Sequence, residues 1–413
     1  MTLPLHHRRN RREGRDPDET HRVATPLELL FDLTFVVAFG IAADEMAHYL
    51  AEDHVRTAVL GFAMSAFAIM WAWINFSWFA SAYDTDDWLY RLTTMVQMVG
   101  VVILALGLAP VFESIDEGEH VDNRVMVAGY VVMRVAMVFQ WARAAGHDPP
   151  RRAAATTYIV SILIAQAGWI ALLLANTSVG VTFLWIVVLV AVEFAGPWIA
   201  ERYRGGTPWH PHHIAERYGL LVIIALGEGI IGTIASMAAI VGPEGPGWSV
   251  DAALVALAGV GLTFGLWWTY FVVPCGEILH LRREKSFGWG YGQIPIIGAV
   301  VAIGGGLHVA AYYIEEESVL GAGATMLCVA IPVAVYVLGL YALYTYLASG
   351  IDGFHVLLLA LSVAVVAVSL LMAAGGVSMA WCLLVLSLTP WVTVIGYELH
   401  GHERNARVLE SLH

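Results

Sequence analysis

Long apolar runs dominate the hydrophobic pattern of this chain, and short polar segments separate them. A helix needs about 20 apolar residues to cross a hydrocarbon core of about 30 Å. Twelve such runs occur, at residues 27–48, 57–80, 88–112, 123–145, 156–176, 180–201, 213–240, 251–274, 287–312, 321–346, 354–374 and 376–397. The pattern predicts an all-α, polytopic integral membrane bundle of about twelve transmembrane helices.

The composition supports this prediction and excludes several classes of protein. Hydrophobic residues make up 59% of the 413-residue chain and charged residues 13%, whereas a soluble domain carries about 25% charged residues. The net charge of −13 excludes nucleic acid as a main partner, because a polyanion binder presents a basic surface. The three cysteines stand far apart and form neither a zinc motif nor a disulfide framework.

The basic residues are distributed unevenly over the connections between spans. Of the 21 lysines and arginines, 17 fall in the two tails or beside even-numbered connections, and only Arg56 and Arg124 fall beside odd-numbered ones. The odd connections are acidic instead, with Glu113, Asp116, Glu117, Glu119, Glu315, Glu316 and Glu317. Basic loops stay on the cytoplasmic side, so both termini are expected in the cytoplasm.

Two polar tails flank the predicted spans. Residues 1–24, with Arg8, Arg9, Arg11, Arg12, Arg15 and Arg22, are expected to form a disordered basic cytoplasmic tail able to touch anionic lipid. This tail is not expected to precede a cleavable signal, because the first apolar run contains Glu28 and Asp32. Residues 399–413, with Arg404 and Arg407, are expected to form a cytoplasmic C-terminal tail.

The two halves of the chain show a weak internal similarity. The segment opening at Glu28 corresponds to the one opening at Glu216, Trp71-Ala-Trp73 corresponds to Trp267-Trp268, and residues 100–107 correspond to 298–305. The offsets between these pairs drift slowly, as loop insertions would cause. We therefore expect two parallel six-helix repeats, residues 25–203 and 211–398, related by an axis along the membrane normal.

Three motifs carry a resemblance to a known family. They are Pro26-Leu-Glu-Leu-Leu-Phe-Asp-Leu-Thr-Phe-Val-Val-Ala, Tyr83-Asp-Thr-Asp-Asp87 running into Arg91, and His213-Ile-Ala-Glu-Arg-Tyr-Gly-Leu followed by Leu226-Gly-Glu228. With Trp267-Trp268 and Tyr291-Gly-Gln-Ile-Pro295, they resemble the bacterial low temperature requirement protein A family over residues 24–400. The resemblance implies a polytopic inner-membrane protein without an established biochemical activity. Leu30 stands where the family usually has a second Phe.

A fainter similarity suggests ion conduction as an alternative. Phe31-Asp-Leu-Thr-Phe35 is similar to the first-helix pore motif of the six-plus-six lysosomal potassium channel family. That motif carries Ser directly before the Asp, where this chain has Phe31. The second half of the chain has Leu220 in place of the Asp.

Two carboxylates in the first span are the first candidates for a functional site. Glu28 and Asp32 are four residues apart and therefore lie on one face of a helix. They could form an interfacial pair that caps the helix or bridges to a neighbouring arginine. Alternatively they form a proton or cation site, because two nearby carboxylates disfavour simultaneous ionisation and one of them can then hold a proton.

Charges deeper in other spans are candidates for the same pathway. Glu216 and Arg217 open the seventh span, and Glu228 lies near its middle between Gly227 and Gly229, which makes Glu228 the strongest functional candidate. Arg134, in the middle of the fourth span, must be paired or hydrated. Its candidate partners are Glu193, Asp32 and Glu228, and it could alternatively bind an anion in a pathway.

Histidines gather before and within the seventh span. His212, His213 and Glu216 form a candidate divalent metal site, with His210 close by, because imidazole and carboxylate ligands one turn apart suit such ions. The alternative places these histidines at the membrane interface beside Pro211. His308 in the ninth span is either a proton relay or a side chain bonded to the backbone.

An acidic turn follows the second span. Asp84, Asp86 and Asp87, with Arg91 one turn further on, are either a solvated turn or a cytoplasmic gate for a cation or proton. The tryptophans, including Trp71 and Trp73, are expected to anchor the membrane interfaces.

Three classes of function remain. Duplicated halves and charges at membrane depth favour a proton- or cation-coupled secondary transporter or ion-conducting protein of unknown substrate. A non-catalytic protein of membrane stress or cold adaptation would use the same charges only for stability. A metal-assisted intramembrane enzyme acting on a lipid-linked substrate is less favoured, because HExxH and GxSxG motifs are absent from the sequence. No cofactor is predicted; the expected partners are the lipid bilayer, an ion or small molecule, and a further copy in a homo-oligomer.

Overall fold

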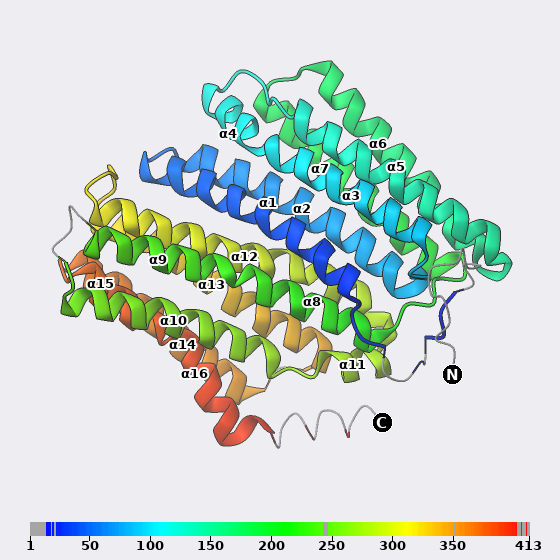
Figure 1. The fold of residues 1–413 in the computed structure, drawn as a ribbon. Coiled ribbons are helices and arrows are strands. Elements are labelled where there is room, and N and C mark those ends of the chain that lie inside the picture. Colours follow the sequence, from blue (N-terminus) through cyan, green and yellow to red (C-terminus); the bar gives the residue numbers. More distant parts are fainter. Residues whose placement is uncertain are drawn as a thin grey trace. The chain divides into compact units, whose positions relative to one another are not determined.

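A computed structural model of the chain describes residues 14–17, 19, 22–242, 247–350, 352–402, 406 and 410, and the regular elements of this part are helices. The α-helices are α1 (Pro26–Ala51), α2 (Val55–Tyr83), α3 (Trp88–Leu106), α4 (Leu108–Glu117), α5 (Arg124–His147), α6 (Arg152–Ala175), α7 (Val179–Tyr203), α8 (Pro211–Ala225), α9 (Gly227–Val241), α10 (Val250–Phe271), α11 (Cys275–Leu281), α12 (Ser286–Ile314), α13 (Ala322–Ala348), α14 (Gly353–Ala374), α15 (Met379–Ser387) and α16 (Thr389–Gly396) (Figure 1). Short helical turns are η1 (Pro149–Arg151), η2 (Arg283–Lys285) and η3 (Tyr397–Gly401).

The predicted helical membrane bundle is confirmed. Within the described residues, twelve helical spans are long and apolar enough to cross a membrane. Several of them consist of two segments: the third span is α3 followed by α4, and the seventh is α8 followed by α9 with an interruption at Leu226. Helices suit this environment because each satisfies its own backbone hydrogen bonds where water is absent.

Polar residues at the ends of the apolar runs fix where helices begin. Thr25-Pro26-Leu27-Glu28 forms a capping box at the start of α1: the Thr25 amide donates to Glu28 Oε2 at 2.7 Å, and the Glu28 amide donates to Thr25 Oγ1 at 3.3 Å. Pro26 is well suited to the first helical position, which needs no amide donor. Asp87 caps α3 in a related way by accepting a bond from the Tyr90 amide.

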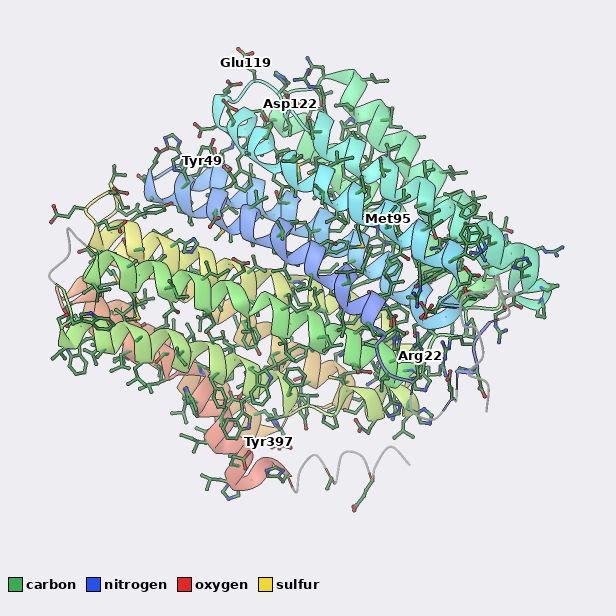
Figure 2. The ribbon with its side chains drawn as sticks, viewed as in Figure 1. Arg22, Tyr49, Met95, Glu119, Asp122 and Tyr397 are labelled. Atoms are coloured by element: carbon green, nitrogen blue, oxygen red, sulfur yellow. The ribbon has the colours of Figure 1, made fainter. Side chains whose placement is uncertain are left out.

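The contacts between helices divide the chain into two units. Unit 1 contains Met1–Ile41 and Ala68–Arg217. Within it α3, α5, α6 and α7 pack in the order of the sequence, each against the next (Figure 1). The loop between α4 and α5 holds Glu119 and Asp122, and these acidic residues lie at one end of the unit (Figure 2).

Unit 2 contains Ala42–Phe67 and Tyr218–His413, with α12 at its centre. The span of α12 is 83% buried, and the helix packs against both α9 and α13. Three consecutive glycines allow this close packing. A Cβ on Gly304 would lie 2.7 Å from the Glu228 backbone on α9, one on Gly305 would lie 2.9 Å from the Ala43 carbonyl on α1, and one on Gly306 would clash with Cys328 on α13.

The other helices of unit 2 complete the bundle around this centre. α10 packs against α9, α15 and α16, and α14 packs against α13, α15 and α16. The order α12, α13, α14, α15 thus follows the chain, as the order α3, α5, α6, α7 does in unit 1. This order is compatible with duplicated halves, and the repeats at 25–203 and 211–398 stay a prediction.

Most of the predicted tails lie outside the described residues. This holds for Arg8, Arg9, Arg11 and Arg12 in the N-terminal tail and for Arg404 and Arg407 in the C-terminal tail. The described residues just before α1 make specific contacts: the Arg15 amide donates to the Ala82 carbonyl at 3.0 Å, and Arg22 is only 7% exposed.

Candidate functional site

Unit 1 contains a buried network that we call the arginine–carboxylate cluster: Arg22, Glu28, Asp32, His213 and Arg217. At its centre, Arg217 on α8 contacts both acidic residues of α1. Its Nη1 lies 2.8 Å from Glu28 Oε1, and its Nη2 donates to Asp32 Oδ1 at 2.6 Å. The one-turn spacing of Glu28 and Asp32 therefore places both carboxylates on the face that meets one guanidinium group, as the sequence predicts.

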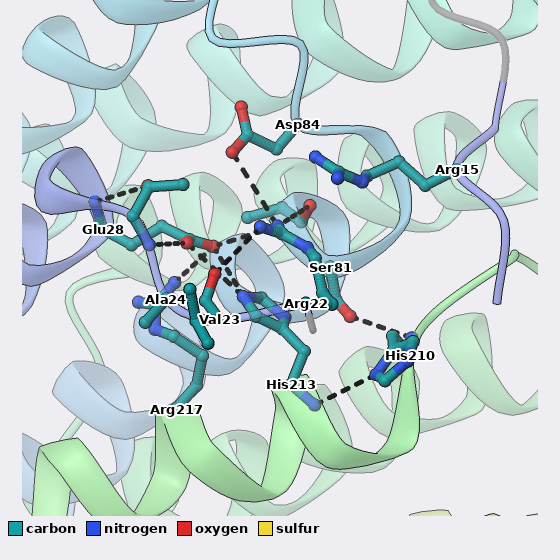
Figure 3. A network of polar contacts seen from close by, with 12 residues as sticks. Arg15, Arg22, Val23, Ala24, Glu28, Ser81, Asp84, His210, His213 and Arg217 are labelled. Atoms are coloured by element: carbon teal, nitrogen blue, oxygen red, sulfur yellow. Dashed lines mark hydrogen bonds and ion pairs between the residues drawn. The ribbon is translucent and has the colours of Figure 1, made fainter. Parts of the chain in front are cut away.

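Glu28 is the most highly connected member of the cluster. Besides its place in the capping box, it lies 3.3 Å from His213 Nε2 through Oε1 and 3.7 Å from Arg22 Nη2 (Figure 3). Arg22 comes from the segment that precedes α1, and His213 from the first turn of α8. Three separate segments of the chain thus meet at one buried carboxylate.

The two carboxylate oxygens of Asp32 differ in their hydrogen bonds. Trp73 Nε1 donates to Asp32 Oδ1 at 2.7 Å, and the Arg217 guanidinium lies 5.6 Å from the centre of the same indole ring. Asp32 Oδ2 is buried and accepts no hydrogen bond from any described residue. Buried carboxylate oxygens normally have a donor, so Oδ2 is the position where a proton or a cation would be stabilised.

The charges of the cluster and its nearest neighbour are unequal. Glu28, Asp32 and Asp84 are three carboxylates, and they face two guanidinium groups, Arg22 and Arg217. His213 is either neutral or positive. The balance of charge in the cluster therefore changes when a carboxyl group gains or loses one proton.

A second buried pair in unit 1 lies around Arg134. Its Nη2 donates to Glu193 Oε2 at 3.1 Å and to the Tyr130 hydroxyl at 3.2 Å. Trp71 Nε1 donates to Glu193 Oε2 at 2.7 Å and Trp169 Nε1 to Oε1 at 3.3 Å, so both oxygens are occupied. Of the three partners considered for Arg134, the structure shows Glu193.

The expectation that the tryptophans anchor the membrane interfaces is wrong for Trp71 and Trp73. Both side chains are fully buried, at 1% and 0% exposure, and each donates its indole N–H to a buried carboxylate. The composition of a span does not tell which of its tryptophans face the interior. A tryptophan that is buried needs an acceptor for its N–H, and the intramembrane acids supply it here.

The three aspartates of the acidic turn in unit 1 contact three different arginines. Asp84 lies 3.8 Å from Arg22. Asp86 forms an exposed bidentate pair with Arg91, with contacts of 2.8 and 2.7 Å. Asp87 is buried, caps α3 and accepts a bond from Arg143 at 2.8 Å. Asp84 thus contacts an arginine of the arginine–carboxylate cluster, and a joint role of these residues as a cytoplasmic gate stays a prediction.

The environment of Asp84 raises the pKa of its carboxyl group. Burial, together with the nearby Glu28 carboxylate, raises the pKa of Asp84 to about 6, against the opposing effect of Arg22. The folded protein therefore prefers the protonated carboxyl. The protonated Asp84 carboxyl therefore stabilises the folded protein relative to the ionised form. This stabilisation is fully present below the ordinary pKa of an aspartate and is lost as the pH rises through about 6.

We expect Asp84→Asn to raise the thermal stability of the detergent-solubilised protein at pH 7.5, by up to about 3 kcal/mol, and to change little at pH 4. Asparagine cannot ionise, and its Oδ1 can still accept the 2.8 Å bond from the Asp86 amide. Melting curves at both pH values test this. Asp86→Asn, at an exposed position, is the control, and a gain of equal size at both pH values would contradict the assignment.

The candidate metal ligands are not brought together. His213 faces Glu28, Glu216 accepts a bond from the Ala24 amide at 3.2 Å, and His212 is exposed. Neighbouring residues on a helix point about 100° apart, which separates His212 from His213. Among the described residues, no group of three or more His, Cys, Asp or Glu side chains could hold a metal ion.

Unit 2 contains the remaining predicted site residue, Glu228, in the first turn of α9. It is 3% exposed, and it interacts electrostatically with Asp44 and His308 of the same unit. A cavity of unit 2 lies elsewhere, and none of its lining residues is a predicted site residue. Those lining residues include Tyr341, Tyr344, Phe354, His355 and Tyr397.

Three participants were missed by reasoning from the sequence. The sequence places Arg22 in the tail, Trp73 at the membrane interface and Arg143 beside an even-numbered connection, yet each contacts a buried aspartate or glutamate. The Thr25–Glu28 capping box was visible in the sequence and fixes how Glu28 is held. The partners themselves could not be found from spacing, because Asp32 and Arg217 are 185 residues apart.

The fold and the buried ion pairs define a polytopic helical membrane protein with charged clusters inside its bundle. The chain belongs to the family described as bacterial low temperature requirement A protein (LtrA), which it matches over residues 23–389. This confirms the resemblance seen in the sequence. It is also similar to the uncharacterized protein RA0937 of Rhizobium meliloti (strain 1021), with 26% identity over 291 residues, 66% of each chain. No solved structure matches.

Proposed function

We propose that this protein moves protons or cations across the bacterial inner membrane, as a coupled secondary transporter or an ion-conducting protein. The observation that carries the proposal is the unoccupied, buried oxygen of Asp32, beside an arginine shared with Glu28. An intramembrane ionisable group is costly to bury, so a spare acceptor at such a site favours a functional role.

The geometry supports a reversible site. Arg217 holds Asp32 through Oδ1, and Oδ2 is left for a proton or a desolvated cation. Arg22 and His213 contact the neighbouring Glu28. A change of charge at Asp32 therefore alters the electrostatic environment of groups on two other segments. The basic residues beside the even connections support an orientation with this end of the bundle toward the cytoplasm.

The test reconstitutes the purified protein in liposomes that contain a pH-sensitive dye and imposes a potassium or proton gradient in either direction. We expect flux in the wild type and a fall to the rate of protein-free liposomes in Asp32→Asn. This substitution keeps an acceptor for Trp73 and Arg217 and removes the charge. It therefore separates ion handling from packing.

Asp122→Asn is the matched control, because it removes an aspartate that pairs with the exposed Arg124 in the same unit and should leave the flux unchanged. Glu28→Gln provides a second test if Asp32→Asn is poorly folded. Full flux in a folded Asp32→Asn variant would contradict the assigned site. Absence of flux in the wild type under every gradient would overturn the proposal itself.

A further inference from the structure

Glu228 in unit 2 is a buried acid without a hydrogen-bond or ion-pair partner among the described residues. It is 3% exposed, and its interactions with Asp44 and His308 are electrostatic only. A permanently ionised carboxylate at membrane depth would need a closer partner. The side chain is therefore placed to gain and lose a proton.

The packing of α12 brings His308 close to the helices that carry both acids. Gly304 contacts the Glu228 backbone on α9, and Gly305 contacts Ala43, the neighbour of Asp44 on α1. His308 follows these glycines by one helical turn, so its side chain lies on the faces of α12 that meet both helices. Side chains in place of these glycines would push the helices apart and separate the three ionisable groups.

His308 is already bound to one of the acids. Its Nδ1 lies 2.8 Å from Asp44 Oδ1, and the side chains of His308 and Asp44 are 14% and 63% exposed. Its Nε2 forms no hydrogen bond with the described residues, which leaves this nitrogen available for a proton. Exposure thus rises stepwise from Glu228 through His308 to Asp44.

We propose that Glu228, His308 and Asp44 form a proton relay that connects the buried interior of unit 2 with the surface. In one step His308 Nδ1 takes a proton that has reached Asp44, and Nε2 passes a proton to the Glu228 carboxylate. The O–H bond of protonated Asp44 breaks as the Nδ1–H bond forms, the Nε2–H bond breaks as an O–H bond forms on Glu228, and no electrons are exchanged. The relay adds a route for protons to the proposed function. It rests on that function, because transport would use the transferred proton.

The described helices around the relay carry several other ionisable groups. Tyr312, one turn beyond His308, interacts with Asp44, Glu315 and Glu317 at the end of α12. On α1 the nearby groups are Glu45 and His48, and α10 contributes Asp251 near its start. The helix α13 carries no Asp, Glu, Lys, Arg or His. Asp44, the most exposed of the three side chains, therefore forms the surface end of the relay.

Infrared difference spectra of the full-length protein in lipid vesicles, recorded across a pH titration, test the relay without requiring transport. A protonated carboxyl group has a C=O stretching band that the carboxylate lacks. We expect such a band in the wild type, with one component from Asp84 and one from Glu228. Glu228→Gln should remove the second component, and His308→Gln should shift the titration midpoint of that component, because the imidazole no longer exchanges protons with Glu228.

His355→Gln is the matched control, since it removes a histidine of unit 2 that lies in the cavity away from Glu228. It should leave the band and its midpoint unchanged. If Glu228→Gln removes no component of the band, or if His308→Gln leaves the midpoint of the Glu228 component unchanged, the relay is overturned. Flux that is absent in the wild type, with these spectra as expected, would instead overturn only the proposed function.

Discussion

Arg217→Met is expected to destabilise the protein by about 3–5 kcal/mol, the cost of breaking a buried ion pair by removing one partner. Arg217 is fully buried and contacts both Glu28 and Asp32. Methionine fills a similar volume but leaves two carboxylates without their central cation. Thermal unfolding in detergent, compared with that of the wild type at pH 7.5, measures the loss.

The cause of this loss can be tested by removing the stranded charges. Combining Arg217→Met with Glu28→Gln and Asp32→Asn should restore part of the stability, because the carboxylates that lost their partner are then neutral. Arg91→Met is the control: its pair with Asp86 is exposed, and its removal should cost no more than about 1 kcal/mol. If Arg217→Met melts like the wild type, the cluster does not stabilise the fold.

The transmembrane helices could be predicted from the sequence because the bilayer leaves few choices. Each span must be about 20 apolar residues long and must satisfy its own backbone, so length and hydropathy were sufficient to find twelve spans. The interruption at Leu226 was not predicted, because neighbouring apolar residues hide a one-residue change in helix bonding.

The candidate site was only partly predictable. The shared face of Glu28 and Asp32 follows from helix geometry, and it is confirmed by their common contact with Arg217. The pairing itself depends on which helices pack together, which local spacing does not specify. The candidate metal ligands illustrate the same limit, since His212 and His213 are adjacent in the chain and have different surroundings.

The second prediction with a large effect concerns Arg134 and Glu193. Glu193→Leu should destabilise the protein by about 3–5 kcal/mol, because it leaves Arg134 buried without a counter-ion. It also removes the acceptor of the Trp71 and Trp169 indole N–H groups. Arg134→Met should be costly for the converse reason, as Glu193 then remains charged in the interior.

The double variant decides between a structural and a functional role for this pair. Replacing both residues by apolar ones removes the unpaired charge, so it should be less destabilising than the sum of the single changes, by roughly 0.5–3 kcal/mol. If the folded double variant conducts ions as the wild type does, the pair only stabilises unit 1. If the double variant is stable but its flux is lost, Arg134 lies on the pathway. The proposed function then involves two buried clusters of unit 1. Additive effects on stability would show that the 3.1 Å contact does not couple the two residues.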